Sequence, residues 1–178
     1  MDEKDLEVIK DVLSGKKYRY KEIVDRYSGL CLYFFKVRFR YDFETARDLT
    51  QEAFMEAFRC LNQFSGKSFK AWFMAICRNM AIDHSRRNKG SPELNFELQE
   101  SDVSTQGFEG PWLRKKMIID TLNTLPERQR EIIEMRYFWD LKCTEIAQIQ
   151  KIPEGTVKSD LHFARLRLIE LLKGSENV

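Results

Sequence analysis

Small, hydroxyl-bearing and cationic side chains are concentrated on one side of the segment that follows Pro153. If this segment is a helix, four of its apolar residues fall within about 60° of one another and form a buried stripe. They are Val157, Leu161, Ala164 and Leu168. Side chains away from this stripe could approach phosphates and base edges closely. The candidate contacts are Glu154, Gly155, Thr156, Lys158, Ser159, His162 and Arg165.

The residues before Pro153 supply the rest of a helix-turn-helix. A short helix is expected over 143–150, followed by a tight turn at 151–153, and proline suits the start of a second helix. Inward-facing apolar residues are predicted in the short helix (Ile146, Ala147, Ile149) and in a supporting helix over 126–138 (Ile132, Ile133, Phe138). The arrangement would present the second helix to a DNA major groove. The alternative is an ordinary helical hairpin with a solvated polar face.

A second set of residues suits single-stranded nucleic acid. The predicted helix over 68–88 has a large apolar share, most of which is expected in the core: Trp72, Phe73, Ile76, Met80 and Ile82. Aromatic residues at loop edges beside basic helices can stack on exposed bases and bind the backbone. The candidate residues are Asn62, Phe64 and Ser65 in the preceding loop and Arg78, Asn79, Asp83, Arg86 and Arg87 on the helix.

A third set lies on a predicted amphipathic helix over 43–61. Its apolar side comprises Leu49, Ala53 and Ala57 and, slightly rotated, Phe54 and Phe58. The opposite side carries Asp48, Gln51, Glu52 and Met55. An acidic, amide-bearing face with one methionine could dock on another protein. Periodicity alone favours the plainer interpretation, a solvated helix face.

Catalytic and metal chemistry find little support in the sequence. It contains no Ser/His/acid set and no phosphate-cradling glycine loop, so we expect neither an enzyme nor a small-molecule substrate. Its four cysteines have no C-x-x-C pair, and we expect reduced cysteines packed in helices, with no metal and no cofactor.

No apolar run approaches the roughly 18 residues of a membrane span, and the acidic start lacks a signal-peptide core. A cytoplasmic protein is expected.

The predicted fold is all-α, with two small helical domains joined by a flexible acidic linker. Glycines and prolines lie between the periodic runs, and no stretch alternates convincingly as a strand would. Residues 91–111 hold five acids and no base, in a composition typical of a linker. We therefore expect domains at 1–90 and 112–178, of which the second contains the helix-turn-helix. Helices are expected at 3–13, 18–39, 43–61, 68–88, 112–123, 126–138, 143–150 and 154–172.

Both halves of the chain resemble the sigma-70 family, especially its extracytoplasmic-function (ECF) group. In the second half, Leu125-Pro126, Glu145-Ile-Ala147 and the run from Ile152 to Ser159 match that family. In the first half, the Asp48-Leu-x-Gln51-Glu52-x-Phe54 pattern matches its polymerase-docking helix. Phe69-x-x-Trp72 and the run from Arg78 to Arg87 match the helix that holds the −10 promoter element. Only about 22 residues separate the two halves, which fits the ECF group.

The resemblance implies a function and a set of partners. It implies a sigma factor that joins core RNA polymerase, recognises promoter DNA, opens the strands and initiates transcription. The loop over 62–68 would capture a flipped base at −10, and the recognition helix would read the −35 element. An anti-sigma factor, often membrane-anchored, would restrain the protein and could hold it at the inner face of the membrane. A helix-turn-helix regulator that never joins polymerase is the alternative.

The sequence also departs from the family pattern at four positions. Lys151 replaces the usual turn glycine, and Lys142 replaces the usual capping hydroxyl. Asp160 and Phe163 stand where arginine is common.

Overall fold

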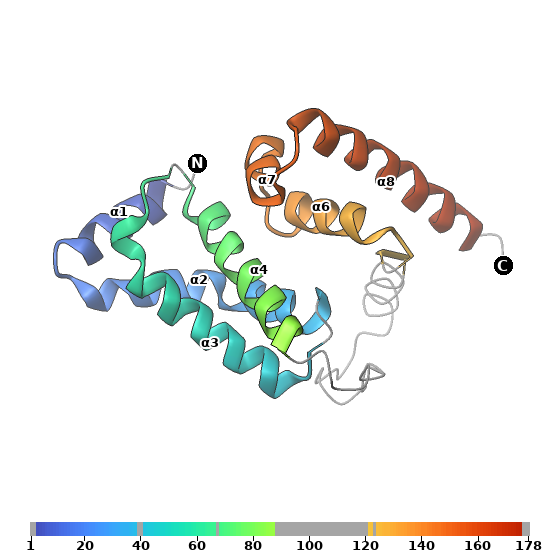
Figure 1. Cartoon of the computed structure of the whole chain (residues 1–178). Helices are drawn as coiled ribbons and strands as arrows, with labels where there is room; N and C mark the ends of the chain where they lie inside the picture. Colours follow the sequence, from blue (N-terminus) through green and yellow to red (C-terminus); the bar gives the residue numbers. More distant parts are fainter. Residues whose placement is uncertain (1–2, 39–40, 67, 88–120, 123, 176–178) are drawn as a thin grey trace, which may run out of the picture. The chain divides into compact units, whose positions relative to one another are not determined.

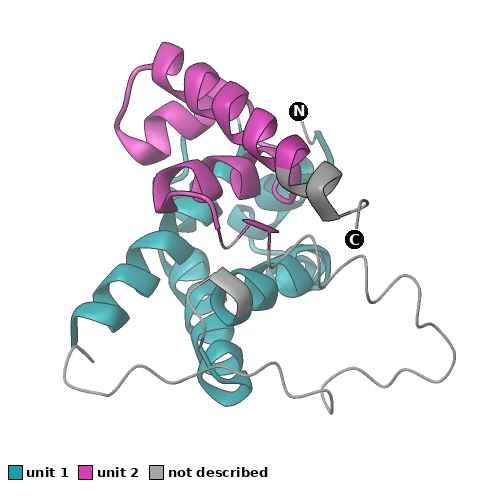
Figure 2. Ribbon diagram, turned by 90° about the vertical axis from the view of Figure 1, so that its right-hand side faces the viewer, with its two compact units in different colours: residues 1–98 teal, residues 99–178 magenta. Residues whose placement is uncertain are grey.

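The computed structural model describes residues 3–38, 41–66, 68–87, 121–122 and 124–175, which fall into two compact units, 1–98 and 99–178 (Figures 1 and 2). Within the described residues the chain is helical and has no strand, which confirms the all-α prediction. The predicted linker over 91–111, and all of the predicted helix over 112–123 except residues 121–122, lie outside this description. The domain boundaries therefore stay a prediction. None of the described helices is both long and apolar enough to cross a membrane.

The described residues of the first unit form four α-helices and three short helical turns (Figure 1). Helix boundaries agree with the predicted ranges to within two residues, except in the range predicted as one helix over 18–39. That range is a 3₁₀ turn, an α-helix and a π-helical turn in succession. The elements are α1 (Glu3–Leu13), η1 (Lys17–Arg19), α2 (Tyr20–Tyr33), η2 (Phe34–Arg38), α3 (Phe43–Arg59), η3 (Leu61–Gln63) and α4 (Phe69–Arg87).

Aromatic side chains form the centre of the first unit. Tyr27 of α2 meets Phe69 and Phe73 of α4 at ring-centroid distances of 5.8 and 6.2 Å. Phe54 of α3 stacks on Phe73 at 4.7 Å. The Tyr27 hydroxyl donates to the buried carboxylate of Asp5, which is how a buried polar group is accommodated. Three helices are thus joined around one ring cluster.

The buried side of α4 differs from the prediction. Of the five apolar residues expected mostly in the core, only Phe73 is buried, while Trp72, Ile76, Met80 and Ile82 are partly exposed. Because apolar residues lie all around this helix, periodicity could not select the correct side. The buried residues are Phe69, Phe73, Met74, Cys77 and Ala81.

Two cysteines that are distant in the sequence meet in this core. The Sγ atoms of Cys31 in α2 and Cys77 in α4 lie 3.5 Å apart, and both thiols are buried. Burial raises the pKa of the Cys77 thiol well above its ordinary value. Neither residue is in a disulfide. The two thiols act as small apolar groups where α2 and α4 approach closely.

The second unit contains α6 (Glu127–Tyr137), α7 (Cys143–Gln150) and α8 (Glu154–Ser175) (Figure 1). Trp139 is fully buried, as are the predicted core residues Ile132 and Ile146. The predicted stripe of α8 is buried at its first three positions and half-buried at Leu168. Both α6 and α7 contact α8, and α7 and α8 follow one another as the predicted helix-turn-helix.

Backbone features of the helix-turn-helix account for two departures from the family pattern. Lys142 precedes α7, and its backbone N–H donates to Glu145 Oε2 at 2.7 Å. The Glu145 carboxylate therefore accepts a hydrogen bond from a backbone N–H at the start of α7, although residue 142 has no side-chain hydroxyl to cap the helix. Lys151 ends α7 in the left-handed region, at φ 56° and ψ 42°.

Candidate nucleic-acid interface and partner-binding face

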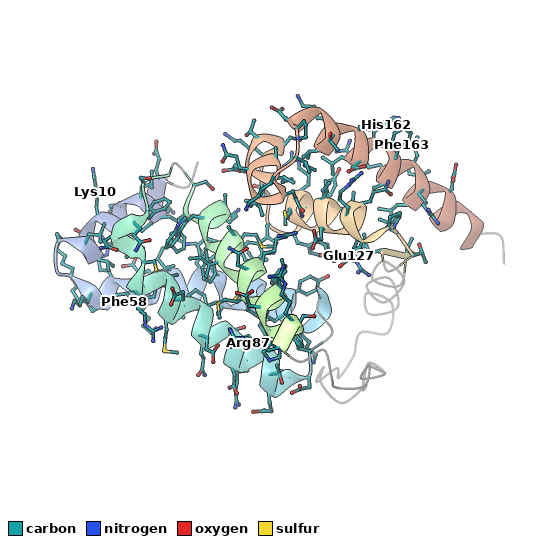
Figure 3. All side chains as sticks on the ribbon, in the orientation of Figure 1. Lys10, Phe58, Arg87, Glu127, His162 and Phe163 are labelled. Carbon is teal, nitrogen blue, oxygen red and sulfur yellow. The ribbon has the colours of Figure 1, made fainter. Side chains whose placement is uncertain are left out.

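The outer side of α8 carries the polar residues predicted to meet duplex DNA. Gly155, Lys158, Ser159, His162 and Arg165 are exposed, opposite the buried stripe, and His162 projects outward from the helix in Figure 3. The other two predicted contacts, Glu154 and Thr156, are half-buried. A recognition helix needs this division, because one side must be held by protein while the other stays open to a groove.

The two cations on this face have different neighbours. Lys158 Nζ lies 2.7 Å from Glu154 Oε1, and this charged hydrogen bond raises the pKa of the lysine. The guanidinium carbon of Arg165 lies 5.5 Å from the ring centre of Tyr137, the last residue of α6. Tyr137 is 54% exposed. Lys158 therefore stands beside a carboxylate, whereas Arg165 stands beside a neutral ring.

Asp160 lies on the buried side of α8. Its carboxylate is 6% exposed and accepts from Arg128 Nε at 2.8 Å and Nη2 at 3.4 Å. Gln150 in turn donates to Glu131 at 2.6 Å, joining α7 to α6. The acid that replaces the family's usual arginine is therefore part of the contact between α8 and α6. Phe163, the other departure on α8, is exposed beside the His162 ring (Figure 3).

The loop before α4 presents polar residues around a partly packed aromatic ring. Asn62 and Ser65 are exposed, as a base-capturing role requires. Phe64 is half-buried and contacts the rings of Trp72 at 5.4 Å and Phe69 at 5.9 Å. Gly66 allows this packing, since a Cβ there would lie 3.3 Å from the Phe64 ring. Phe64 is thus a structural residue with part of its surface open.

The exposed side of α4 is mainly basic at its end. Asn79, Asp83, Arg86 and Arg87 are exposed, and Arg87 closes the helix in Figure 3. Arg78, predicted with this group, is only partly exposed. The nearest ion pair, Arg86 to Asp83, spans 3.9 Å between exposed groups and is therefore weak.

The predicted partner-binding face of α3 is open to solvent. Asp48, Gln51 and Glu52 are exposed, and Met55 is 51% exposed. Phe58, expected on the core side and labelled in Figure 3, is instead 37% exposed. Its ring meets that of Tyr20 edge-on, with 4.9 Å between the ring centroids. Phe58 is rotated around the helix axis from Leu49, Ala53 and Ala57, and it therefore lies at the edge of the buried side of α3.

A groove between α3 and α4 brings two of the predicted sets together. It has a volume of about 530 Å³ and is lined by residues of both helices: Glu52, Met55, Glu56, Arg59, Ile76, Asn79, Met80 and Asp83. Glu52 and Met55 belong to the predicted docking set, and Asn79 and Asp83 to the predicted −10 set. The structure therefore makes these two sets neighbours, although about 25 residues of sequence separate them.

Family comparisons match both units. The Sigma-70 region 2 family matches residues 23–90 in the first unit, and Sigma-70, region 4 matches residues 115–168 in the second. The RNA polymerase sigma-H factor of Pseudomonas aeruginosa is 32% identical over 176 residues, covering 92% of this chain and 91% of that relative. The chain belongs to the sigma-70 family. Its membership of the ECF group follows from relatives such as the ECF RNA polymerase sigma factor SigW of Bacillus subtilis, 29% identical over 93% of this chain and 95% of SigW.

Two solved structures share the fold, one of them a sigma factor. Bartonella quintana RpoE, solved with the anti-sigma factor NepR, has a TM-score of 0.65 at 27% identity, covering 86% of this chain and 96% of RpoE. CnrH, solved with the cytosolic domain of CnrY, has a TM-score of 0.67 at 21% identity, covering 94% and 96% of the two chains. The latter likeness concerns the fold alone.

Sequence reasoning missed several contacts in this ECF sigma factor. Neither the contact of Tyr137 with Arg165 nor the ion pair of Asp160 with Arg128 was predicted. Both contacts join α6 to α8, so the sequence offers no local signal for them. A buried position within the stripe of α8 could have indicated that Asp160 needs a cationic partner.

Proposed function

We propose that this ECF sigma factor binds core RNA polymerase and directs it to promoter DNA without catalysing a reaction itself. The observation that carries this proposal is the order of the two family regions. Region 2 and region 4 each fall within one compact unit of a single chain. A helix-turn-helix regulator that does not join polymerase would need only the second of these units.

Three exposed faces divide the work in this proposal. The face of α3 formed by Asp48, Gln51, Glu52 and Met55 docks on polymerase, and its exposed acids and methionine suit a protein partner. The loop around η3 and the basic end of α4 hold opened strand at −10. The outer side of α8 meets duplex DNA at −35.

An anti-sigma factor is the third proposed partner. Supporting this, Bartonella quintana RpoE was solved in complex with an anti-sigma factor. The free chain leaves its polar helix faces open, so a competitor can cover them. We place the protein in the cytoplasm, where a membrane-anchored anti-sigma factor would hold it at the inner face of the membrane.

In vitro transcription tests the main proposal. Purified core polymerase is incubated with this chain and a genomic library, and the transcription start sites are mapped. We expect new start sites that depend on the added chain, together with co-purification of chain and core. Binding to DNA without any association with core polymerase would favour the regulator.

A pull-down from uninduced cells tests the anti-sigma proposal. We expect a second, non-polymerase protein that is released on induction. Recovery of polymerase subunits alone under every condition would contradict this part and leave the main proposal intact.

A further inference from the structure

Arg165 combines an exposed charge with an ordered position. The residue lies seven positions after Lys158, which on a helix is two turns along nearly the same line. Within the described part of the chain, no carboxylate lies within ion-pair distance of Arg165, whereas Lys158 is paired with Glu154. A phosphate approaching Lys158 must compete with that carboxylate. A phosphate approaching Arg165 meets no such competitor there.

Tyr137 explains how Arg165 is held without losing its charge. An aromatic ring attracts a guanidinium within about 6 Å through its negative face, and here the separation is 5.5 Å. A guanidinium carries five N–H donors around its planar edge, so the donors that do not face the ring remain available for phosphate oxygens. The contact therefore orders the side chain and preserves what a phosphate needs.

The position of Tyr137 supports a role beyond filling space. It closes α6, and the nearby Trp139 turns into the core and is fully buried. Tyr137 remains more than half exposed and contacts a residue on the outer side of α8. An exposed aromatic ring that contacts a cation adds little to core stability. The effect of Tyr137 is therefore expected in binding at the surface.

We propose that Tyr137 is a positioning residue for duplex DNA, holding the Arg165 guanidinium on the DNA-facing side of α8. The contact surface at −35 then includes the end of α6 as well as the recognition helix. This inference rests on the proposed assignment of α8 to duplex DNA.

A double-mutant cycle in the holoenzyme tests the inference. The probe is a duplex carrying the −35 element of a promoter mapped in the transcription experiment, and affinity is measured by electrophoretic shift. Tyr137→Ala is expected to weaken binding by about two- to fivefold, the range of an exposed cation–π contact. Tyr137→Phe keeps the ring and is expected to bind as wild type. In an Arg165→Ala background, Tyr137→Ala is expected to add no further loss.

Controls separate this role from stability and from general charge. Thermal melts should be nearly unchanged, because Tyr137 and Arg165 are exposed. Arg167→Ala removes an equal charge from another side of α8 and should cost less affinity than Arg165→Ala.

Additive losses in the double mutant, or equal losses from Tyr137→Phe and Tyr137→Ala, would overturn the inference. Wild-type binding by Tyr137→Ala alongside weakened Arg165→Ala would overturn it while leaving the α8 assignment intact. Wild-type binding by Arg165→Ala would remove that residue's proposed DNA contact and the inference with it.

Discussion

At the scale of single residues, Lys151 sets the geometry of the helix-turn-helix through its backbone. Its φ of 56° turns the chain sharply after α7, and the N–H of Ile152 returns to Ala147 O at 3.1 Å. A left-handed conformation costs an L-residue roughly 1–2 kcal/mol, a cost from which glycine is exempt. The surrounding helices impose this conformation on a lysine.

Replacing Lys151 tests this strain. Lys151→Gly is expected to be about 1 kcal/mol more stable than Lys151→Ala, because both remove the side chain and only glycine fits the left-handed region freely. Lys151→Asn should be intermediate. Thermal or urea unfolding of the full chain measures the difference. Equal stabilities of the glycine and alanine variants would show that the turn is not strained.

The exposure of a residue could be predicted from the sequence only where neighbours on its own helix determine it. The exposed sides of α3 and α8 followed from helical spacing, because position along one helix decided them. Phe64 could not be assigned in the same way, since its partial burial depends on Trp72 and Phe69. Asp160 was recognised as a departure, but its partner Arg128 lies on another helix.

At the scale of elements, α3 owes its start to Asp42. The Asp42 carboxylate accepts from the Thr45 backbone N–H at 3.0 Å and from its hydroxyl at 2.6 Å. The hydroxyl first, and the backbone N–H with it, lower the pKa of Asp42 below its ordinary value of 3.8. An N-cap of this kind contributes about 1 kcal/mol to helix stability.

This cap gives α3 a predicted pH dependence. Because the pKa is lower in the folded state, the stabilisation is present above about pH 3.8 and is lost as pH falls through the folded pKa. Asp42→Ala should cost about 1 kcal/mol at pH 7 and less at pH 3 and below. Asp42→Asn, a neutral cap, should retain most of the stability at pH 7. Chemical denaturation at both pH values measures this, and a pH-independent cost of Asp42→Ala would contradict it.

The predicted docking face of α3 can be altered without disturbing the side of the helix that packs in the core. Asp48→Lys with Glu52→Lys reverses two exposed charges, so core-polymerase binding should fall while the thermal melt stays nearly unchanged. The matched control is Glu3→Lys with Asp25→Lys, which reverses two exposed charges on α1 and α2. Normal assembly by the α3 double variant, measured by gel filtration with core polymerase, would remove this assignment.

The same scale shows the limits of periodicity. Boundaries of amphipathic helices such as α7 were predictable because their apolar residues recur with the period of a helical turn. The buried side of α4 was not, because Trp72, Ile76 and Met80 are as apolar as the residues that are buried. The π-helical turn at 34–38 contacts both α2 and α3, and it has no sequence signature here.

At the scale of the whole molecule, promoter recognition is predicted to divide between the two units. Lys158→Ala with Arg165→Ala should weaken closed-complex binding and flatten its salt dependence, because phosphate contacts release counterions. Electrophoretic shift of holoenzyme at several salt concentrations measures this. Wild-type binding at every salt concentration would show that the face of α8 has been misassigned.

The first unit should act at the later step of strand opening. Phe64→Ala should leave duplex binding largely intact but impair opening, since stacking on a base contributes roughly 1–3 kcal/mol. Because Phe64 also packs on Trp72, Phe64→Leu is the matched variant: it keeps apolar volume and loses the aromatic face. Permanganate footprinting of the start region measures opening. Normal opening by both variants would move base capture elsewhere in the loop.

The order of the two units could be predicted because each carries its own motifs. Their internal packing could not, since contacts such as Cys31 with Cys77 join residues 46 positions apart. Spacing along the sequence carries no information about which helices approach closely enough for such a contact.

The opposite sides of α8 have an evolutionary consequence. Val157, Asp160, Leu161 and Ala164 hold the helix in place, while Lys158, Ser159, His162 and Arg165 face outward and carry little of the fold's stability. Substitutions on the outer side can therefore accumulate without an offsetting change inside. If this side reads promoter DNA as proposed, a duplicated gene for such a protein can drift toward a new promoter in small steps, each still producing a folded chain. Diversification of target genes then proceeds faster than diversification of the scaffold.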